Sequence, residues 1–243
     1  MVEELRNAIN RYKHLLKGGE IDYDKTLLVE EIEEELIENA KRNDEIIKIL
    51  DNNELTTALA KLTEKLREDY VRVSEKLGHR LTNFDEALEA FLTGKKDVPG
   101  FNIIFIIIQA YARLKAQLYE EEKGNINNST AECPVCGAIS RTMLKEDERT
   151  YSMICPFCGY KWIVSTNGLR CPYCGNTDKL AIGVFTGKKL KRLGLAWCQS
   201  CGETWRVVLD KGIKVPRLFL TALSFGAEIY RNAIPRDADV TDS

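Results

Sequence analysis

Eight cysteines occur in this chain of 243 residues, and all of them fall into four Cys-x-x-Cys pairs. A pair with this spacing lets two thiolates on one tight turn bind a single metal ion, and two such turns complete a tetrahedral site of four sulfurs. Taken in chain order, the pairs form two sets of four, which we expect to be the ligands of two metal ions. The first set is Cys133, Cys136, Cys155 and Cys158, and the second set is Cys171, Cys174, Cys198 and Cys201.

The residues around each pair are typical of a metal-binding knuckle. Glycine follows the second cysteine in all four pairs, and proline follows the first cysteine in three of them. Glycine adopts positive φ at little cost, which turns backbone N–H groups toward the sulfurs. Each set of four also ends with a tryptophan four residues after its last cysteine, Trp162 and Trp205. The chain therefore predicts a duplicated unit of knuckle, hairpin, knuckle and buried tryptophan, the arrangement of rubredoxins and zinc ribbons.

Other uses of these cysteines fit the sequence less well. A disulfide within Cys-x-x-Cys is strained, and a thioredoxin-type dithiol needs a βαβ pattern that the chain lacks. Four thiolates leave no open coordination position, so we expect no catalysis at these sites, and no other catalytic motif occurs in the chain. Iron and zinc both suit four sulfurs, and the sequence leaves the choice between them open.

The first half of the chain reads as helix. Residues 55–77 carry one apolar stripe at spacings of three and four, which predicts a single long helix. Thr82 and Asp85 have the spacing of a capping box for the next helix. Residues 101–123 begin apolar on all sides, which predicts a helix at the centre of a bundle. The glutamates of the run from Glu30 to Glu38 are expected to cover a solvated helix face.

The fold class expected is α+β: an N-terminal all-α bundle, two small four-cysteine modules and a C-terminal helix. The segment 124–132 lacks periodicity and is expected to be a linker. The predicted boundaries are 1–123 for the helical domain, 124–132 for the linker, 133–168 and 169–212 for the modules, 213–235 for the last helix and 236–243 for a disordered tail.

Four stretches of this sequence carry a resemblance to a known family. They are CPVCG from Cys133, RTYSMICPFCGYKW from Arg149, RCPYCGN from Arg170 and WCQSCGETW from Trp197. In these motifs the chain resembles the formate dehydrogenase accessory proteins of the FdhE family. Its spacer between Trp162 and Cys171 is longer than usual there, and an acidic pair expected before the last helix is missing, which indicates a divergent member.

The resemblance implies a cytoplasmic maturation factor that is not itself an enzyme. Its partner would be the catalytic subunit of a molybdenum or tungsten formate dehydrogenase, and the metal would be iron. Two alternatives remain: a zinc-ribbon protein that binds nucleic acid or acts in transcription, and a rubredoxin-like electron carrier. The net charge of −2 and the acidic helical half disfavour nucleic acid as a partner. We expect no membrane span, and the sequence does not give the oligomeric state.

Six residues are candidate partner contacts. Phe157 and Tyr173 precede the second cysteine of their knuckles, where a side chain either meets a partner or packs between the two modules. Four basic side chains lie at the tip of the longer hairpin: Lys188, Lys189, Lys191 and Arg192. They form either a solvated tip or an electrostatic contact with an acidic partner.

Overall fold

The computed structural model describes residues 23–209 apart from 94, 96 and 185–192. These residues divide into a helical unit that ends at Glu122 and a sheet unit that begins at Lys123. The predicted C-terminal helix (213–235), the predicted tail (236–243) and the four basic residues of the hairpin tip lie outside the described residues.

The helices of the first unit surround α7. Their bounds are α2 (Tyr23–Lys41), α3 (Asp44–Asn52), α4 (Leu55–Lys61), α5 (Thr63–Lys76), α6 (Phe84–Thr93) and α7 (Phe101–Lys123). The prediction of a buried start for α7 is confirmed, because Ile104 and Ile107 are fully buried and the isoleucines beside them nearly so. Side chains of α7 contact α2, α3 and α5 through hydrogen bonds and α6 through aromatic rings.

Two local predictions for the helical unit are wrong. The stripe over residues 55–77 is divided between α4 and α5, because Leu62 leaves helical geometry (φ −97°, ψ 13°). Leu62 and Leu66 are both buried, so the apolar pattern continues across the break and conceals it. The cap of α6 is Asn83, whose Oδ1 accepts from the N–H of Asp85 at 2.9 Å, whereas Thr82 hydrogen-bonds to the hydroxyl of Tyr70 at 2.5 Å.

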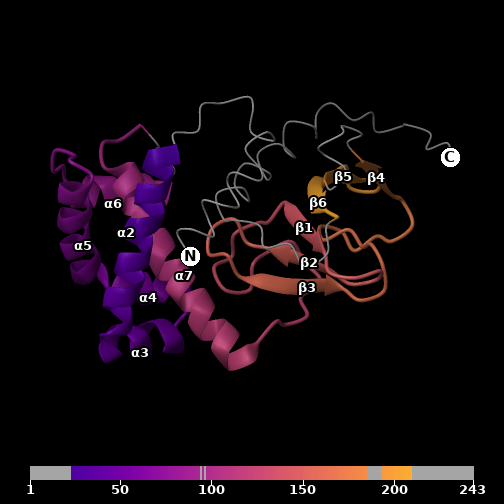
Figure 1. Cartoon of the computed structure of the whole chain (residues 1–243), viewed down its shortest axis with the longest axis horizontal. Helices are drawn as coiled ribbons and strands as arrows, with labels where there is room; N and C mark the ends of the chain where they lie inside the picture. The colour runs from indigo at the N-terminus through magenta and orange to yellow at the C-terminus, as the bar shows by residue number, and fades with distance from the viewer. Residues whose placement is uncertain (1–22, 94, 96, 185–192, 210–243) are drawn as a thin grey trace. The chain divides into compact units, whose positions relative to one another are not determined.

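The second unit contains one sheet that both cysteine sets share. Its strands are β1 (Thr142–Lys145), β2 (Tyr151–Ile154), β3 (Lys161–Ser165), β4 (Leu180–Val184), β5 (Leu193–Cys198) and β6 (Thr204–Val208). Among the described residues the order is β3-β2-β1-β6-β5-β4, so each module contributes an antiparallel meander of three strands. The two meanders join where β1 pairs in parallel with β6, with Met143 opposite Val207. Figure 1 shows the strands of both modules side by side in one sheet, with three strands from each module.

The segment predicted as a linker, 124–132, lies along the outer edge of β3. Its backbone exchanges two hydrogen bonds with Ile163, from Asn128 N to Ile163 O and from Ile163 N to Ile126 O, both 2.9 Å. A sheet edge with unpaired backbone groups invites non-native pairing, and this segment covers that edge. Residues 124–132 therefore form part of the sheet unit as well as joining it to α7.

The tryptophans that end the two modules form the centre of this unit. Trp162 on β3 and Trp205 on β6 are both 0% exposed, as the duplicated pattern predicts.

Among the described residues, no helix combines the length and the apolar character that crossing a bilayer requires.

Candidate metal centres

The four knuckles have the same backbone structure. In each one, the N–H of the glycine donates to the carbonyl of the first cysteine, as from Gly137 to Cys133 at 2.9 Å. The N–H of that first cysteine donates in turn to the residue after the glycine, as from Cys155 to Tyr160 at 2.9 Å. All four glycines have positive φ, between 74° and 78°. The position of the two sulfurs in each knuckle therefore depends on residues next to them in the sequence and not on contacts between distant strands.

The structure brings the sulfurs together in the two predicted sets. In each set, the four Sγ atoms lie within 4.8 Å of one another. The shortest separations join different knuckles: 3.6 Å for Cys133–Cys158, 3.4 Å for Cys136–Cys155, 3.7 Å for Cys171–Cys201 and 3.6 Å for Cys174–Cys198. A tetrahedron with metal–sulfur bonds of about 2.3 Å has edges of about 3.8 Å, so both sets fit one metal ion each. Iron and zinc satisfy this geometry equally.

Crowding of the sulfurs splits the pKa values in the first set. Hydrogen bonding with Cys133 is the largest cause for three thiols: it lowers the pKa of Cys155 far below its usual range and raises the pKa of Cys136 and Cys158. A negative charge on one sulfur therefore opposes ionisation of the others. A divalent cation at the centre would stabilise all four as thiolates, which is the charge state that metal binding requires.

In the second set the largest causes of the pKa shifts are burial and a backbone hydrogen bond. Burial raises the pKa of Cys171, and it also raises the pKa of Cys201, to about 11. A backbone hydrogen bond from Asn176 lowers the pKa of Cys174. This set is more open, because Cys174 and Cys201 are exposed.

Tyr173 lies between the two modules, which is one of the two positions considered for it. Its hydroxyl donates to the carbonyl of Ser140 at 2.9 Å, and its ring lies 5.9 Å from that of Trp205. The guanidinium of Arg141 lies over the same ring and forms an ion pair with Glu203 at 2.9 Å. These contacts tie the third knuckle to the start of β1. Phe157 is half-buried, and its N–H donates to the sulfur of Cys155 at 3.4 Å. A role of either aromatic residue in partner binding remains a proposal.

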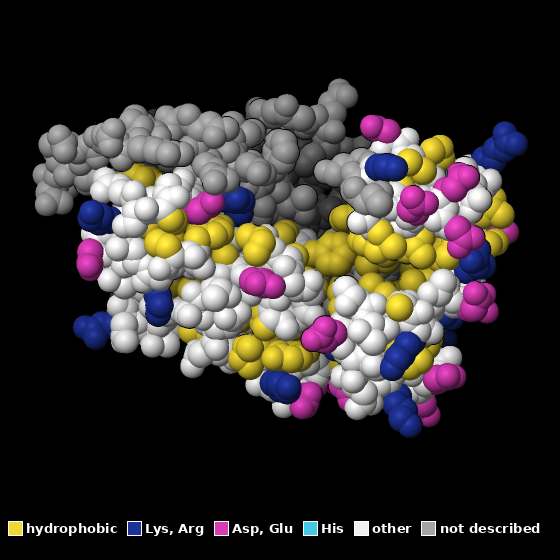
Figure 2. Space-filling model, turned by 180° about the vertical axis from the view of Figure 1, so that it is seen from behind, with side chains coloured by type: hydrophobic (Ala, Val, Ile, Leu, Met, Phe, Trp, Pro, Cys, Tyr) yellow, Lys and Arg dark blue, Asp and Glu magenta, His cyan; other side chains and the backbone are white. Residues whose placement is uncertain are grey.

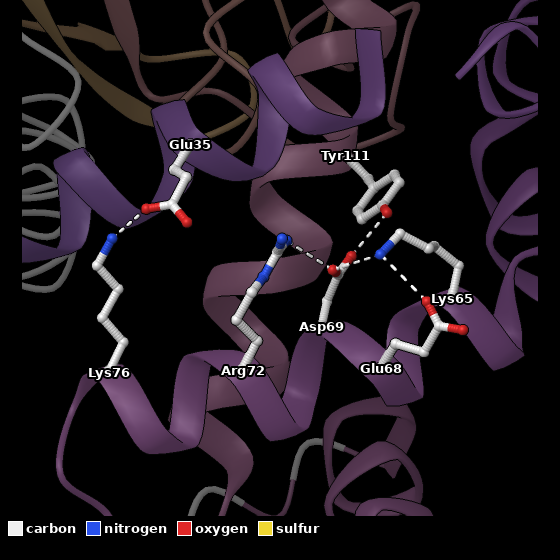
Figure 3. A network of polar contacts seen from close by, with 7 residues as sticks. All are labelled: Glu35, Lys65, Glu68, Asp69, Arg72, Lys76 and Tyr111. Carbon is white, nitrogen blue, oxygen red and sulfur yellow. Dashed lines mark hydrogen bonds and ion pairs between the residues drawn. The ribbon is translucent and has the colours of Figure 1, made fainter. Parts of the chain in front are cut away.

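Two polar clusters in the helical unit are structural rather than catalytic. Figure 3 shows Asp69 of α5, which is 1% exposed, accepting from Lys65, Arg72 and the hydroxyl of Tyr111, each at 2.8 Å. Burial, with the charge of Asp69, raises the pKa of Tyr111. The cluster continues to Glu68, while a separate pair joins Glu35 and Lys76. Both oxygens of Asp69 are occupied, so this carboxylate holds α5 against α7 and offers no free base.

The second cluster corrects part of the prediction of a solvated glutamate face on α2, where Glu31, Glu35 and Glu38 are exposed as predicted. Glu33 is 0% exposed and Glu30 is 7% exposed, and both face Arg113 of α7. Glu34 also pairs with Arg113. Burial alone would lower the pKa of Arg113, and the three glutamates outweigh it and raise that pKa. Glu30 lies three residues before Glu33 and four before Glu34, so the sequence places all three on one side of the helix. The sequence does not show that the distant Arg113 pairs with them.

Comparisons with known proteins found similarity to solved structures but no match among family models or curated proteins. The crystal structure of the FdhE protein from Pseudomonas aeruginosa is similar over 96% of this chain and 92% of its own, with 14% sequence identity and a TM-score of 0.48.

Proposed function

We propose that this chain is an accessory protein for the maturation of a molybdenum or tungsten formate dehydrogenase, and that it binds the catalytic subunit of that enzyme. The proposal rests on one observation, the four knuckles with their flanking aromatic and arginine residues, which are the motifs that resemble the FdhE family. The sulfur geometry is consistent with a binding protein, because two closed four-thiolate sites hold a surface rigid and leave no position for a substrate.

The distribution of charge favours a protein partner over nucleic acid. Residues 131–212 carry 12 basic and 7 acidic residues, a net of +5, which is modest for a phosphate-binding surface. Figure 2 shows basic and acidic side chains interspersed on the face that it presents, without a continuous basic patch among the described residues. A protein surface with mixed charges is a better match for this pattern than a polyphosphate backbone.

The test is recovery of the partner by affinity capture. The tagged chain is expressed, without oxygen, in cells that produce a molybdenum or tungsten formate dehydrogenase, and bound proteins are identified by mass spectrometry. We expect the catalytic subunit among them. A Cys133→Ser variant should lose it, because metal binding supplies most of the folding free energy of so small a module.

The control is a variant whose substitution should not disturb folding. Glu38→Gln changes an exposed residue of α2 and should recover as much catalytic subunit as the unaltered chain. Absence of the subunit from every capture, with both metal ions bound, would contradict the proposal. Binding of DNA or RNA that weakens steeply with salt would then favour the zinc-ribbon alternative.

A further inference from the structure

The two candidate centres differ in how far solvent reaches their sulfurs. In the first set three sulfur-bearing residues are buried and Cys136 is half-buried. In the second set Cys171 and Cys198 are buried, but Cys174 and Cys201 are both exposed. The exposed residues are the second cysteines of their knuckles, so each knuckle of the second set has one exposed cysteine.

The segment 124–132 makes several hydrogen bonds with the first module and one with the third knuckle, from Ala131 N to Pro172 O at 2.8 Å. The hydroxyl of Tyr160, next to the second knuckle, donates to Gly124 O at 2.7 Å. The indole N–H of Trp162 donates to Thr130 O at 2.9 Å. In the second module, the indole N–H of Trp205 has no acceptor among the described residues, although the ring is fully buried. The described part of the second module thus has no counterpart of this segment.

A cationic side chain also lies beside the second centre. A Cβ placed on Gly175, directly after Cys174, would lie 3.0 Å from Nη2 of Arg170, so the guanidinium rests against the third knuckle. The buried Nε of Arg170 finds no hydrogen-bond partner among the described residues. A guanidinium at this place attracts anions such as carboxylates and thiolates.

We infer that the second centre is the exchangeable one: an anionic donor, a carboxylate or a thiolate, reaches its metal ion past Cys174 and Cys201, whereas the first centre retains its ion. In this exchange the sulfur of Cys174 or Cys201 would give up its bond to a metal ion held there as the incoming donor forms one. The released thiolate takes a proton from water, and no change of oxidation state is needed. This inference concerns the isolated chain and does not depend on whether the chain binds a formate dehydrogenase.

The first test uses the unaltered chain, purified without oxygen and loaded with two equivalents of zinc. N-ethylmaleimide adds to thiolates, and the labelled positions are read by mass spectrometry over time. We expect Cys174 and Cys201 to react before the first-set cysteines, with rates at least about tenfold higher, because the first set must open before it reacts. Simultaneous labelling of both sets, or earlier labelling of the first, would overturn the inference.

The second test follows release of zinc to the anionic chelator EDTA. We expect two phases of one equivalent each, with the faster phase belonging to the second centre. Arg170→Gln should slow that phase about threefold at low salt and leave the slower phase unchanged, because a cation at the entrance raises the local concentration of an anion. A single phase for both equivalents would contradict the proposal.

Matched variants assign the two phases. Cys136→Ser in the first centre and Cys174→Ser in the second alter equivalent positions. Each is the second cysteine of the earlier of the two knuckles in its set. Cys174→Ser should change the fast phase more than the slow phase, and Cys136→Ser should change the slow phase more than the fast phase. The reverse assignment would overturn the inference, and the labelling of the unaltered chain decides the matter where a variant fails to fold.

Discussion

At the scale of single residues, the knuckle glycines provide the clearest test of how the sulfurs are positioned. Gly159 has a φ of 78°, and a Cβ added to it would meet nothing within 4 Å. Gly159→Ala therefore adds backbone strain without a clash, and we expect a loss of about 1–2 kcal/mol in the free energy of unfolding. The measurement is denaturant unfolding of the metal-loaded chain, followed by tryptophan fluorescence.

The control for this prediction is Gly183→Ala on β4. Gly183 is exposed, and an added Cβ would lie at an ordinary contact distance of 3.5 Å from the ring of Trp197. This variant should change the free energy of unfolding by less than about 1 kcal/mol. Equal losses in both variants would show that positive φ is not what the knuckle requires.

The sequence predicted most at this scale, because a knuckle is local. The spacing within each pair and the glycine after it specify the turn and place two sulfurs on it, whatever the rest of the chain does. The partners of Asp69 and Arg113 escaped prediction for the opposite reason. The hydrogen bond from Tyr111 to Asp69 and the ion pair of Arg113 with Glu33 join residues about 40 and 80 positions apart, and a single sequence carries no sign of such pairing.

At the scale of the elements, the edge of β3 is where the two modules differ most. Trp162 and Trp205 are equally buried, but only Trp162 donates its indole N–H to an acceptor among the described residues, Thr130 O. Replacing either by phenylalanine removes similar apolar area, and replacing Trp162 also removes a hydrogen bond and strands a carbonyl. We expect Trp162→Phe to lower the free energy of unfolding by about 1 kcal/mol more than Trp205→Phe.

Thermal unfolding of the two variants with both sites loaded measures this difference. A Thr130→Ala variant serves as the control, because it keeps the backbone carbonyl that accepts the bond and should leave the Trp162 contribution intact. Equal losses from the two tryptophan variants would mean that the hydrogen bond from Trp162 to Thr130 adds no stability to the first module. The sequence pattern did not predict the contacts of segment 124–132, since the segment has no periodicity and its hydrogen bonds are made by backbone atoms.

At the scale of the sheet unit, the pairing of β1 with β6 makes one structure of two modules. The duplicated motif predicted a hairpin in each module, but it contained nothing about how the modules join, because parallel pairing between distant strands depends on register and not on composition. Beyond the strand register, Arg206 N donates to Arg141 O at 2.9 Å, and Tyr173 reaches Ser140. Loss of one metal ion should therefore weaken the other module as well.

Hydrogen exchange in a single-site variant tests this coupling in the whole chain. Cys133→Ser removes a buried ligand of the first centre and should unfold β1–β3, because a module this small depends on its metal for folding. The backbone amides of β6 then lose the strand beside them, and we expect their exchange to accelerate about tenfold or more. The amides of α5, in the helical unit, serve as the internal control and should keep their protection. If β6 exchanged at its original rate while β1 exchanged freely, the two modules would be independent in energy despite their common sheet. Faster exchange in β6 would show that the metal ion of the first centre also stabilises the second module.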